Sequence, residues 1–192
     1  AIPCNNRSGE EINEFINKKI NSTIKGDHII DTGVYYPPEK AYYLFKNTQI
    51  DNKAMIIFVK ISSETHKIIN NASLVTTHIN GSWPNLHPHF STNITSITCI
   101  NNEILYFFKK NEVIKYNMKT KTSYTKNPIK ISDEFPNLPK SFEIIDECYY
   151  AGNNIIVFFR GTKFIQYYLN DTRSQIIISN INQGNYGPNM TF

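Results

Sequence analysis

The sequence predicts an all-β fold built from repeats of about fifty residues, preceded by a single helix. Short runs rich in Ile, Tyr, Phe and Val dominate after residue 26, separated by clusters of Pro, Asn, Gly and Asp. The stretch Ile104 to Tyr116, ILYFFKKNEVIKY, returns from Ile155 to Tyr167 as IIVFFRGTKFIQY. A chain of 192 residues that is 40% hydrophobic and 19% charged has ample apolar surface to fold, and its length favours one domain.

The N-terminal segment, residues 1–26, contains the predicted helix in the run GEEINEFINKKINSTIKG. Acidic residues open its first turn and Gly26 follows its last. Its apolar residues recur every three or four positions, at Ile12, Phe15, Ile16, Ile20 and Ile24. We expect this stripe to pack on an open edge of the β structure that follows.

A proline-containing motif marks the repeat. Trp83-Pro84-Asn85-Leu86, Phe135-Pro136-Asn137-Leu138 and the looser Tyr186-Gly187-Pro188-Asn189-Met190 place a proline every 52 residues. Each motif follows a run of predicted strands, and a unit of this length is typical of a propeller blade. The region 27–192 is therefore predicted to hold three blades, at about 27–86, 90–139 and 141–190.

Each blade is predicted as one small antiparallel sheet. The first strands are expected at Ile29–Tyr35, Ser96–Ile100 and Ile144–Tyr150. The second strands are expected at Tyr42–Lys46, Leu105–Lys109 and Val157–Arg160. The turns that follow are expected at Asn47–Gln49, Lys110–Glu112 and Gly161–Lys163, and third strands at Val113–Tyr116 and Phe164–Tyr168.

The run FPNLPKSFEIIDECYYAGNNIIVFFRGTKFIQYY resembles the hemopexin repeat. Blades of that family carry an Ile-Asp-small-small-aromatic strand, a Tyr-Phe-Phe-Lys-Gly strand and turn, an aromatic third strand and a Phe-Pro-Gly-Leu-Pro link. The resemblance extends over about Asp27 to Met190 and implies a small, hemopexin-like β-propeller. The family has four blades and a closing disulfide, whereas this chain shows three blades and no cysteine after Cys148.

The resemblance also implies small residues near the propeller axis, at Gly33, Cys99 and Cys148. It implies an axial channel lined by main-chain carbonyl groups, with Asp31, Ile97 and Asp146 as the matching positions. A structural cation bound through oxygen atoms is the cofactor that this arrangement would hold.

Three cysteines, Cys4, Cys99 and Cys148, allow at most one internal disulfide and leave one thiol over. Burial as compact core residues is the favoured interpretation for Cys99 and Cys148, because free cysteine is among the most buried residue types. Cys4 is then available for an intermolecular bond.

The only closely spaced histidines are His87 and His89, which a strand or extended turn could direct at a metal or a haem iron. A solvated loop is the favoured interpretation. No metalloprotease helix, nucleophile elbow, phosphate-binding loop or Cys-x-x-Cys pair is present, so an enzyme is not expected.

The net charge of +4 comes from many lysines and three arginines, which we take to be spread thinly; a nucleic-acid partner is therefore not expected. No stretch approaches the ~18 apolar residues of a membrane span. Seven N-glycosylation sequons favour a secreted, extracellular protein. They are Asn6, Asn21, Asn71, Asn80, Asn93, Asn170 and Asn189.

The functional prediction is a secreted, glycosylated, hemopexin-like and non-catalytic binding module for an extracellular protein, such as a viral or parasite factor that interacts with its host. A haem or metal-ion carrier using His87 and His89 is the first alternative. The second is a structural assembly module that forms homo- or hetero-oligomers through Cys4 or the N-terminal helix.

Overall fold

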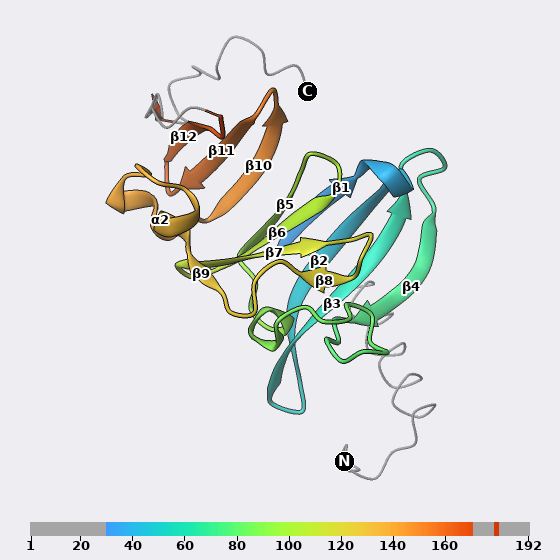
Figure 1. The fold of residues 1–192 in the computed structure, drawn as a ribbon. Coiled ribbons are helices and arrows are strands. Elements are labelled where there is room, and N and C mark those ends of the chain that lie inside the picture. Colours follow the sequence, from blue (N-terminus) through green and yellow to red (C-terminus); the bar gives the residue numbers. More distant parts are fainter. Residues whose placement is uncertain (1–29, 171–178, 181–192) are drawn as a thin grey trace. The chain divides into compact units, whose positions relative to one another are not determined.

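The computed structural model describes residues 30–170 and 179–180, which Figure 1 draws in colour. These residues form three antiparallel sheets and almost no helix, which confirms the all-β prediction. The chain divides into two compact units, unit 1 from Ala1 to Asn93 and unit 2 from Ile94 to Phe192. The helix predicted within residues 1–26 lies outside the described residues.

Unit 1 holds one sheet, whose strands follow the chain order. They are β1 (Thr32–Tyr36), β2 (Ala41–Ile50), β3 (Lys53–Ser62) and β4 (Ile68–Leu74), with the short helices η2 (Pro37–Glu39) and η3 (Pro88–Ser91) outside the sheet. The turn predicted at Asn47–Gln49 is wrong. These residues continue β2, because Asn47 pairs with Ile56 and the chain reverses only at Asp51 and Asn52.

Unit 2 holds two sheets with the same strand order. The first contains β5 (Ser96–Ile100), β6 (Ile104–Lys109), β7 (Glu112–Asn117) and β8 (Thr122–Ser123), and β9 (Ile129–Lys130) also pairs with β7. The second contains β10 (Glu147–Gly152), β11 (Ile155–Arg160), β12 (Lys163–Tyr168) and β13 (Ser179–Asn180). The chain between β9 and β10 contains two short helices, α2 (Ile131–Glu134) and η4 (Lys140–Phe142).

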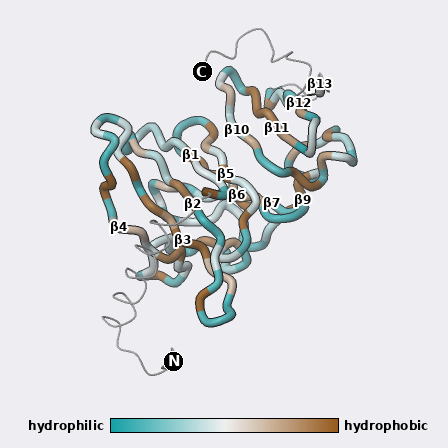
Figure 2. Tube along the Cα trace, turned by 180° about the vertical axis from the view of Figure 1, so that it is seen from behind, coloured by the Kyte–Doolittle hydropathy of each residue, from teal (hydrophilic) through white to brown (hydrophobic). Residues whose placement is uncertain are grey.

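The hairpin turns use residues that tolerate a positive φ. Asp51 and Asn52 have φ values of 50° and 62°, and Asn153 and Asn154 have values of 50° and 61°. Two consecutive left-handed residues define the type I′ turn, whose twist matches that of the paired strands. The many asparagines of this chain therefore have a local structural role, and Figure 2 shows hydrophilic turns between more apolar strands.

The aromatic-Pro-Asn-Leu motif forms the same turn in both units. The asparagines in third position, Asn85 and Asn137, have φ values of 58° and 67°, and the leucine N–H donates to the aromatic residue's carbonyl at 3.2 Å in each copy. Proline second and a left-handed residue third define a type II turn. The turn buries the aromatic residue, since Trp83 is 2% exposed and Phe135 is 0% exposed.

In unit 1, Trp83 packs on the face of the sheet. Its ring centroid lies 5.6 Å from those of Tyr43, Phe45 and Phe58, which come from β2 and β3. Edge-to-face and tilted geometries of this kind stabilise aromatic clusters beyond the area that they bury.

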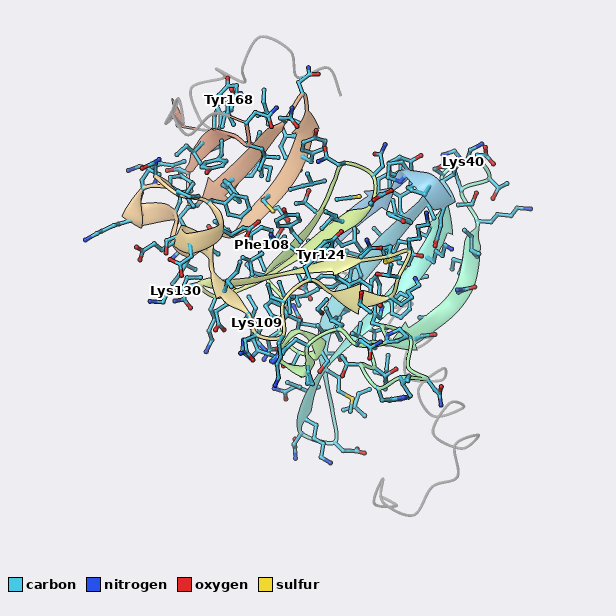
Figure 3. All side chains as sticks on the ribbon, in the orientation of Figure 1. Lys40, Phe108, Lys109, Tyr124, Lys130 and Tyr168 are labelled. Carbon is cyan, nitrogen blue, oxygen red and sulfur yellow. The ribbon has the colours of Figure 1, made fainter. Side chains whose placement is uncertain are left out.

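In unit 2, Phe135 occupies the equivalent place and also joins the two sheets. Its ring lies 6.0 and 6.1 Å from Tyr106 and Phe108 of β6, and 5.0 and 5.4 Å from Phe158 and Tyr167 of β11 and β12. These five rings lie in one hydrophobic core, in which Figure 3 labels Phe108.

Side-chain hydroxyl groups join β5 to β10 without a backbone ladder. Ser96 Oγ accepts from the Cys148 N–H at 3.0 Å, and Thr98 Oγ1 accepts from the Tyr150 N–H at 2.9 Å. The Ser96 hydroxyl also donates to Glu147. Since β10 is an edge strand of its own sheet, these bonds give side-chain partners to N–H groups of an edge strand.

A tyrosine, a lysine and a glutamate form a matching cluster in each of the first two sheets. In unit 1, Lys60 lies opposite Tyr43 in the register, its Nζ is 5.5 Å from the ring centroid, and it pairs with Glu39 at 2.6 Å. Tyr43 donates a hydrogen bond to the same carboxylate. Burial, followed by this bond, raises the pKa of Tyr43.

In unit 2, Lys115 lies opposite Tyr106 and its Nζ is 6.0 Å from that ring. It pairs with Glu134 at 3.0 Å, and burial and then the glutamate raise the pKa of Tyr106. In the last sheet Val157 lies opposite Gln166, so the cluster is absent at that register position. The first two sheets therefore share this Tyr-Lys-Glu cluster in addition to the motifs that repeat in the sequence.

Candidate functional site

The residues predicted to surround an axial ion lie at the start of the first strands. The N–H groups of Asp31, Thr95 and Asp146 donate to the carbonyls of Phe45, Phe108 and Phe159, at 3.0, 2.8 and 2.8 Å. Thr95, and not Ile97, therefore occupies the middle repeat's equivalent position. The prediction placed the middle repeat two residues too far along the chain, because that repeat has no aspartate at the position equivalent to Asp31 and Asp146.

The same register corrects the positions at which small residues were predicted, namely Gly33, Cys99 and Cys148. Gly33 lies opposite Leu44, Ile97 opposite Phe107 and Cys148 opposite Phe158, so Ile97 and not Cys99 matches Gly33 and Cys148. The expectation of a small residue at all three positions is therefore wrong for the middle sheet.

Each aspartate accepts a hydrogen bond from the hairpin of its own sheet, Asp31 from a residue within β2 and Asp146 from the turn after β11. Asp31 Oδ2 accepts from the Asn47 N–H at 2.5 Å, and Asp146 Oδ2 accepts from the Gly161 N–H at 2.6 Å. Asp146 also pairs with Arg160 at 2.8 Å. This geometry supports turn capping for the Asp146 carboxylate and a bond to the β2 backbone for that of Asp31, and a cation held by main-chain oxygens stays a prediction.

The two histidines belong to a turn that recurs in unit 2. His87 Nδ1 accepts from the His89 N–H at 3.2 Å, and the Phe90 N–H donates to the His87 carbonyl at 2.9 Å. The equivalent bond in unit 2 joins the Phe142 N–H to the Pro139 carbonyl at 2.8 Å. In both copies the turn places a fully buried phenylalanine, Phe90 or Phe142, in the core, so this loop has a structural role.

The described residues contain no group of three or more His, Cys, Asp and Glu side chains that could together hold a metal ion. His87 and His89, whose ring centroids are 6.4 Å apart, therefore lack a third ligand of these types within that part of the chain.

Cys99 and Cys148 are free, buried thiols, which confirms the core interpretation over a disulfide for these two residues. Burial raises the pKa of Cys99 to about 11 and raises that of Cys148 further. The disulfide predicted among the three cysteines does not join these two. Cys4 lies outside the described residues.

Three of the predicted sequon asparagines have exposed side chains, namely Asn80, Asn93 and Asn170. Asn71 lies in β4. The others, Asn6, Asn21 and Asn189, lie outside the described residues. Glycosylation at any of the seven stays a prediction.

The most distinctive surface of unit 1 is a row of large apolar side chains across its sheet. Tyr35 lies opposite Tyr42, Tyr42 opposite Ile61, and Ile61 opposite Ile68, so all four side chains share one face. We call these four residues the apolar row. Tyr35, Tyr42 and Ile68 are 40%, 43% and 57% exposed, and Ile61 is half-buried.

The apolar row has a preformed aromatic end and a charged border. The rings of Tyr35 and Tyr42 are 5.0 Å apart and tilted by 42°. Lys40 and Glu64 form an exposed ion pair at 2.5 Å, and this pair raises the pKa of Lys40, with a small contribution from Tyr35. Four strands at about 4.8 Å spacing make the row roughly 14 Å wide.

Sequence reasoning did not identify the apolar row, although the double tyrosines at Tyr35-Tyr36 and Tyr42-Tyr43 carried a signal. In each pair one ring is buried and one is exposed, so both faces of the strand are apolar there. Which rings meet depends on the strand register, which the sequence does not display.

No helix among the described residues is long and apolar enough to cross a membrane. No protein-family model and no curated protein matches the chain.

Solved structures do match. A plant albumin from Cicer arietinum showing hemagglutination aligns with a TM-score of 0.53 and 13% identity, over 81% of this chain and 95% of that one. A plant lectin with two metal binding sites, also from Cicer arietinum, aligns with a TM-score of 0.53 and 15% identity over the same shares. A hemopexin fold protein from cow pea aligns at 0.49 and 15%, over 79% and 91%. The chain shares the fold of the two Cicer arietinum proteins.

Proposed function

We propose that this chain is a divergent hemopexin-like module that is secreted, glycosylated and non-catalytic, and that it binds an extracellular protein. The repeated strand order, the recurrent type II turn and the equivalent aspartates Asp31 and Asp146 support the repeat assignment. The fold shared with a plant albumin showing hemagglutination and a plant lectin supports a binding role.

The observation that carries the proposal is the apolar row. Of the eight large hydrophobic side chains that are exposed among the described residues, six belong to unit 1, and three of those are in the row. Scattered apolar residues on a surface are ordinary, but a contiguous patch with a polar border is typical of a protein-binding surface. Tyrosine is also enriched among residues that dominate binding energy.

A protein partner fits this surface better than a small ligand. The row lies on a sheet face, and four paired strands hold it rigidly, so little conformational entropy is lost on binding. The Lys40–Glu64 pair beside the row offers both charges to a polar rim.

A pull-down from extracellular fluid and cell surfaces tests the proposal. The immobilised glycosylated protein should retain one protein in stoichiometric amount, which mass spectrometry identifies. Tyr42→Ala should weaken its capture about tenfold or more, because a central tyrosine typically contributes more than 1 kcal/mol. Tyr124→Ala removes a tyrosine that is 51% exposed in unit 2 and is the matched control.

Equal loss of the partner with both variants would refute a binding surface at the apolar row. Capture of no protein by the folded, unmodified chain would refute the binding-module proposal itself.

Haem binding by His87 and His89 is the alternative function, and an absorption measurement with added hemin tests it. Hemin added to the protein should give no shifted Soret band if the histidines only support the turn. A shifted band that disappears in the His87→Ala/His89→Ala double variant would replace the protein-binding proposal with a carrier function.

A further inference from the structure

Positive charge is concentrated in one segment of unit 2, contrary to the expectation that the lysines are spread thinly. Between Lys109 and Lys130 the sequence has seven lysines, no arginine and one glutamate. This is a net charge of +6 in a chain whose total is +4, so the remaining residues are acidic on balance. The first acidic residue after this segment is Asp133.

Four of these lysines are exposed, and we call them the lysine strip: Lys110, Lys119, Lys126 and Lys130. None of the four makes an ion pair with another described residue. Of the other three, Lys115 is paired with Glu134, Lys109 is buried and Lys121 is half-buried. The strip is therefore the part of this charge that remains available to a partner.

The strand pairing arranges the strip along one edge of a sheet. β8 and β9 both pair with the outer side of β7, β8 near its end and β9 near its start, as Figure 1 shows. Lys119 lies in the turn between β7 and β8, whereas Lys130 lies opposite Glu112 at the other end of β7. Lys110 lies in the turn that precedes Glu112, so the strip runs the length of β7, about 17 Å.

Exposed lysines that repeat along an edge fit an extended polyanion, because each neutralised charge releases counterions from the polymer. The residues among the lysines are hydroxyl- and amide-rich, namely Thr120, Thr122, Ser123, Thr125 and Asn127, which suits sugar hydroxyl groups. The segment has one exposed aromatic ring, Tyr124, labelled in Figure 3 with Lys109 and Lys130. Single-stranded nucleic acids need several stacking rings and favour arginine.

We infer that the lysine strip is a binding site for a sulfated polysaccharide, separate from the protein-binding apolar row. The chemistry is multipoint attraction between ammonium groups and sulfate groups, without catalysis. Because it uses no residue of the apolar row, the inference can fail or succeed independently of the proposed function.

A fluorescent heparin-derived hexasaccharide is the probe, titrated against the full chain by fluorescence polarisation at low and at physiological salt. The strip variant is Lys119→Gln/Lys126→Gln/Lys130→Gln. Its matched control is Lys53→Gln/Lys67→Gln/Lys163→Gln, which removes three exposed lysines elsewhere and changes the net charge equally. Circular dichroism melting verifies that both variants remain folded.

The unmodified protein should bind the hexasaccharide, with affinity that falls steeply as salt rises. The strip variant should bind roughly 10- to 100-fold more weakly at low salt and show a shallower salt dependence, since about three ionic contacts are lost. The control variant should change by less than about threefold, because long-range charge alone is screened.

Two results would overturn the inference. Equal weakening in the two variants would show that net charge, and not the strip, attracts the polymer. A 16-base-pair DNA duplex that binds more tightly than the hexasaccharide, and loses that affinity in the strip variant, would assign the strip to nucleic acid instead.

Discussion

At the scale of single residues, side-chain hydroxyl groups replace a backbone ladder between β5 and β10. Thr98 is 3% exposed, and its Oγ1 accepts from the Tyr150 N–H at 2.9 Å. Thr98→Val keeps the shape and removes the acceptor, so it should lower the free energy of unfolding by about 1–3 kcal/mol. Thr162→Val, at an exposed turn, should change it by less than about 0.5 kcal/mol. Urea titrations measure both, and equal effects would contradict this role.

The buried thiols give a second residue-scale prediction, about pH. Burial raises the pKa of Cys99 from 9.0 to about 11 in the folded protein. The unfolded chain therefore loses its proton first, so stability should be fully present below pH 9 and decline as pH rises through 11. A Cys99→Ala variant should lose part of this decline, as measured by urea titrations between pH 8 and 11.

The same burial should protect both thiols from reagents. Ellman's reagent at pH 8 should leave Cys99 and Cys148 unmodified in the folded protein and modify both in urea, because only the thiolate reacts. Rapid modification of either one without urea would contradict their burial.

At the scale of elements, the second proline motif is a turn whose third residue must be left-handed. Asn137 has a φ of 67°, which a β-branched residue reaches only at a cost. Asn137→Val should lower the free energy of unfolding by about 1–2 kcal/mol, and Asn137→Gly should leave it nearly unchanged. Urea denaturation of the two variants tests this, and similar losses would mean that the asparagine side chain matters instead of the backbone.

Elements are also where the sequence was most informative. Strands in the second and third sheets begin and end close to their predicted positions, because alternation, paired aromatics and Asn or Gly turns are all local signals. The long β2–β3 hairpin was missed, since Asn47 and Thr48 are common in turns yet here continue a ladder. The prediction of Ile97 failed for a similar reason. The middle repeat has Thr95, and not an aspartate, at the position equivalent to Asp31 and Asp146.

At the scale of the whole molecule, the two proposed binding surfaces could not be predicted from the sequence because they depend on pairing between distant segments. Tyr35 and Ile68 share a row only through two intervening strands, and the two ends of the lysine strip meet one edge only because β8 and β9 both return to β7. That the three sheets close into a propeller stays a prediction, which rests on the sequence repeat.

The two surfaces lie in different units and share no residue, so their ligands should bind independently. Tyr42→Ala should weaken the protein partner and leave the hexasaccharide unchanged, while the lysine strip variant should do the reverse. In the combined variant each ligand should lose as much affinity as in its own single variant, within about 0.5 kcal/mol. Titration of each ligand in the presence of the other should leave both affinities unchanged, since any coupling free energy would change the two affinities equally. A coupling of more than about 1 kcal/mol would contradict the independence of the two ligands.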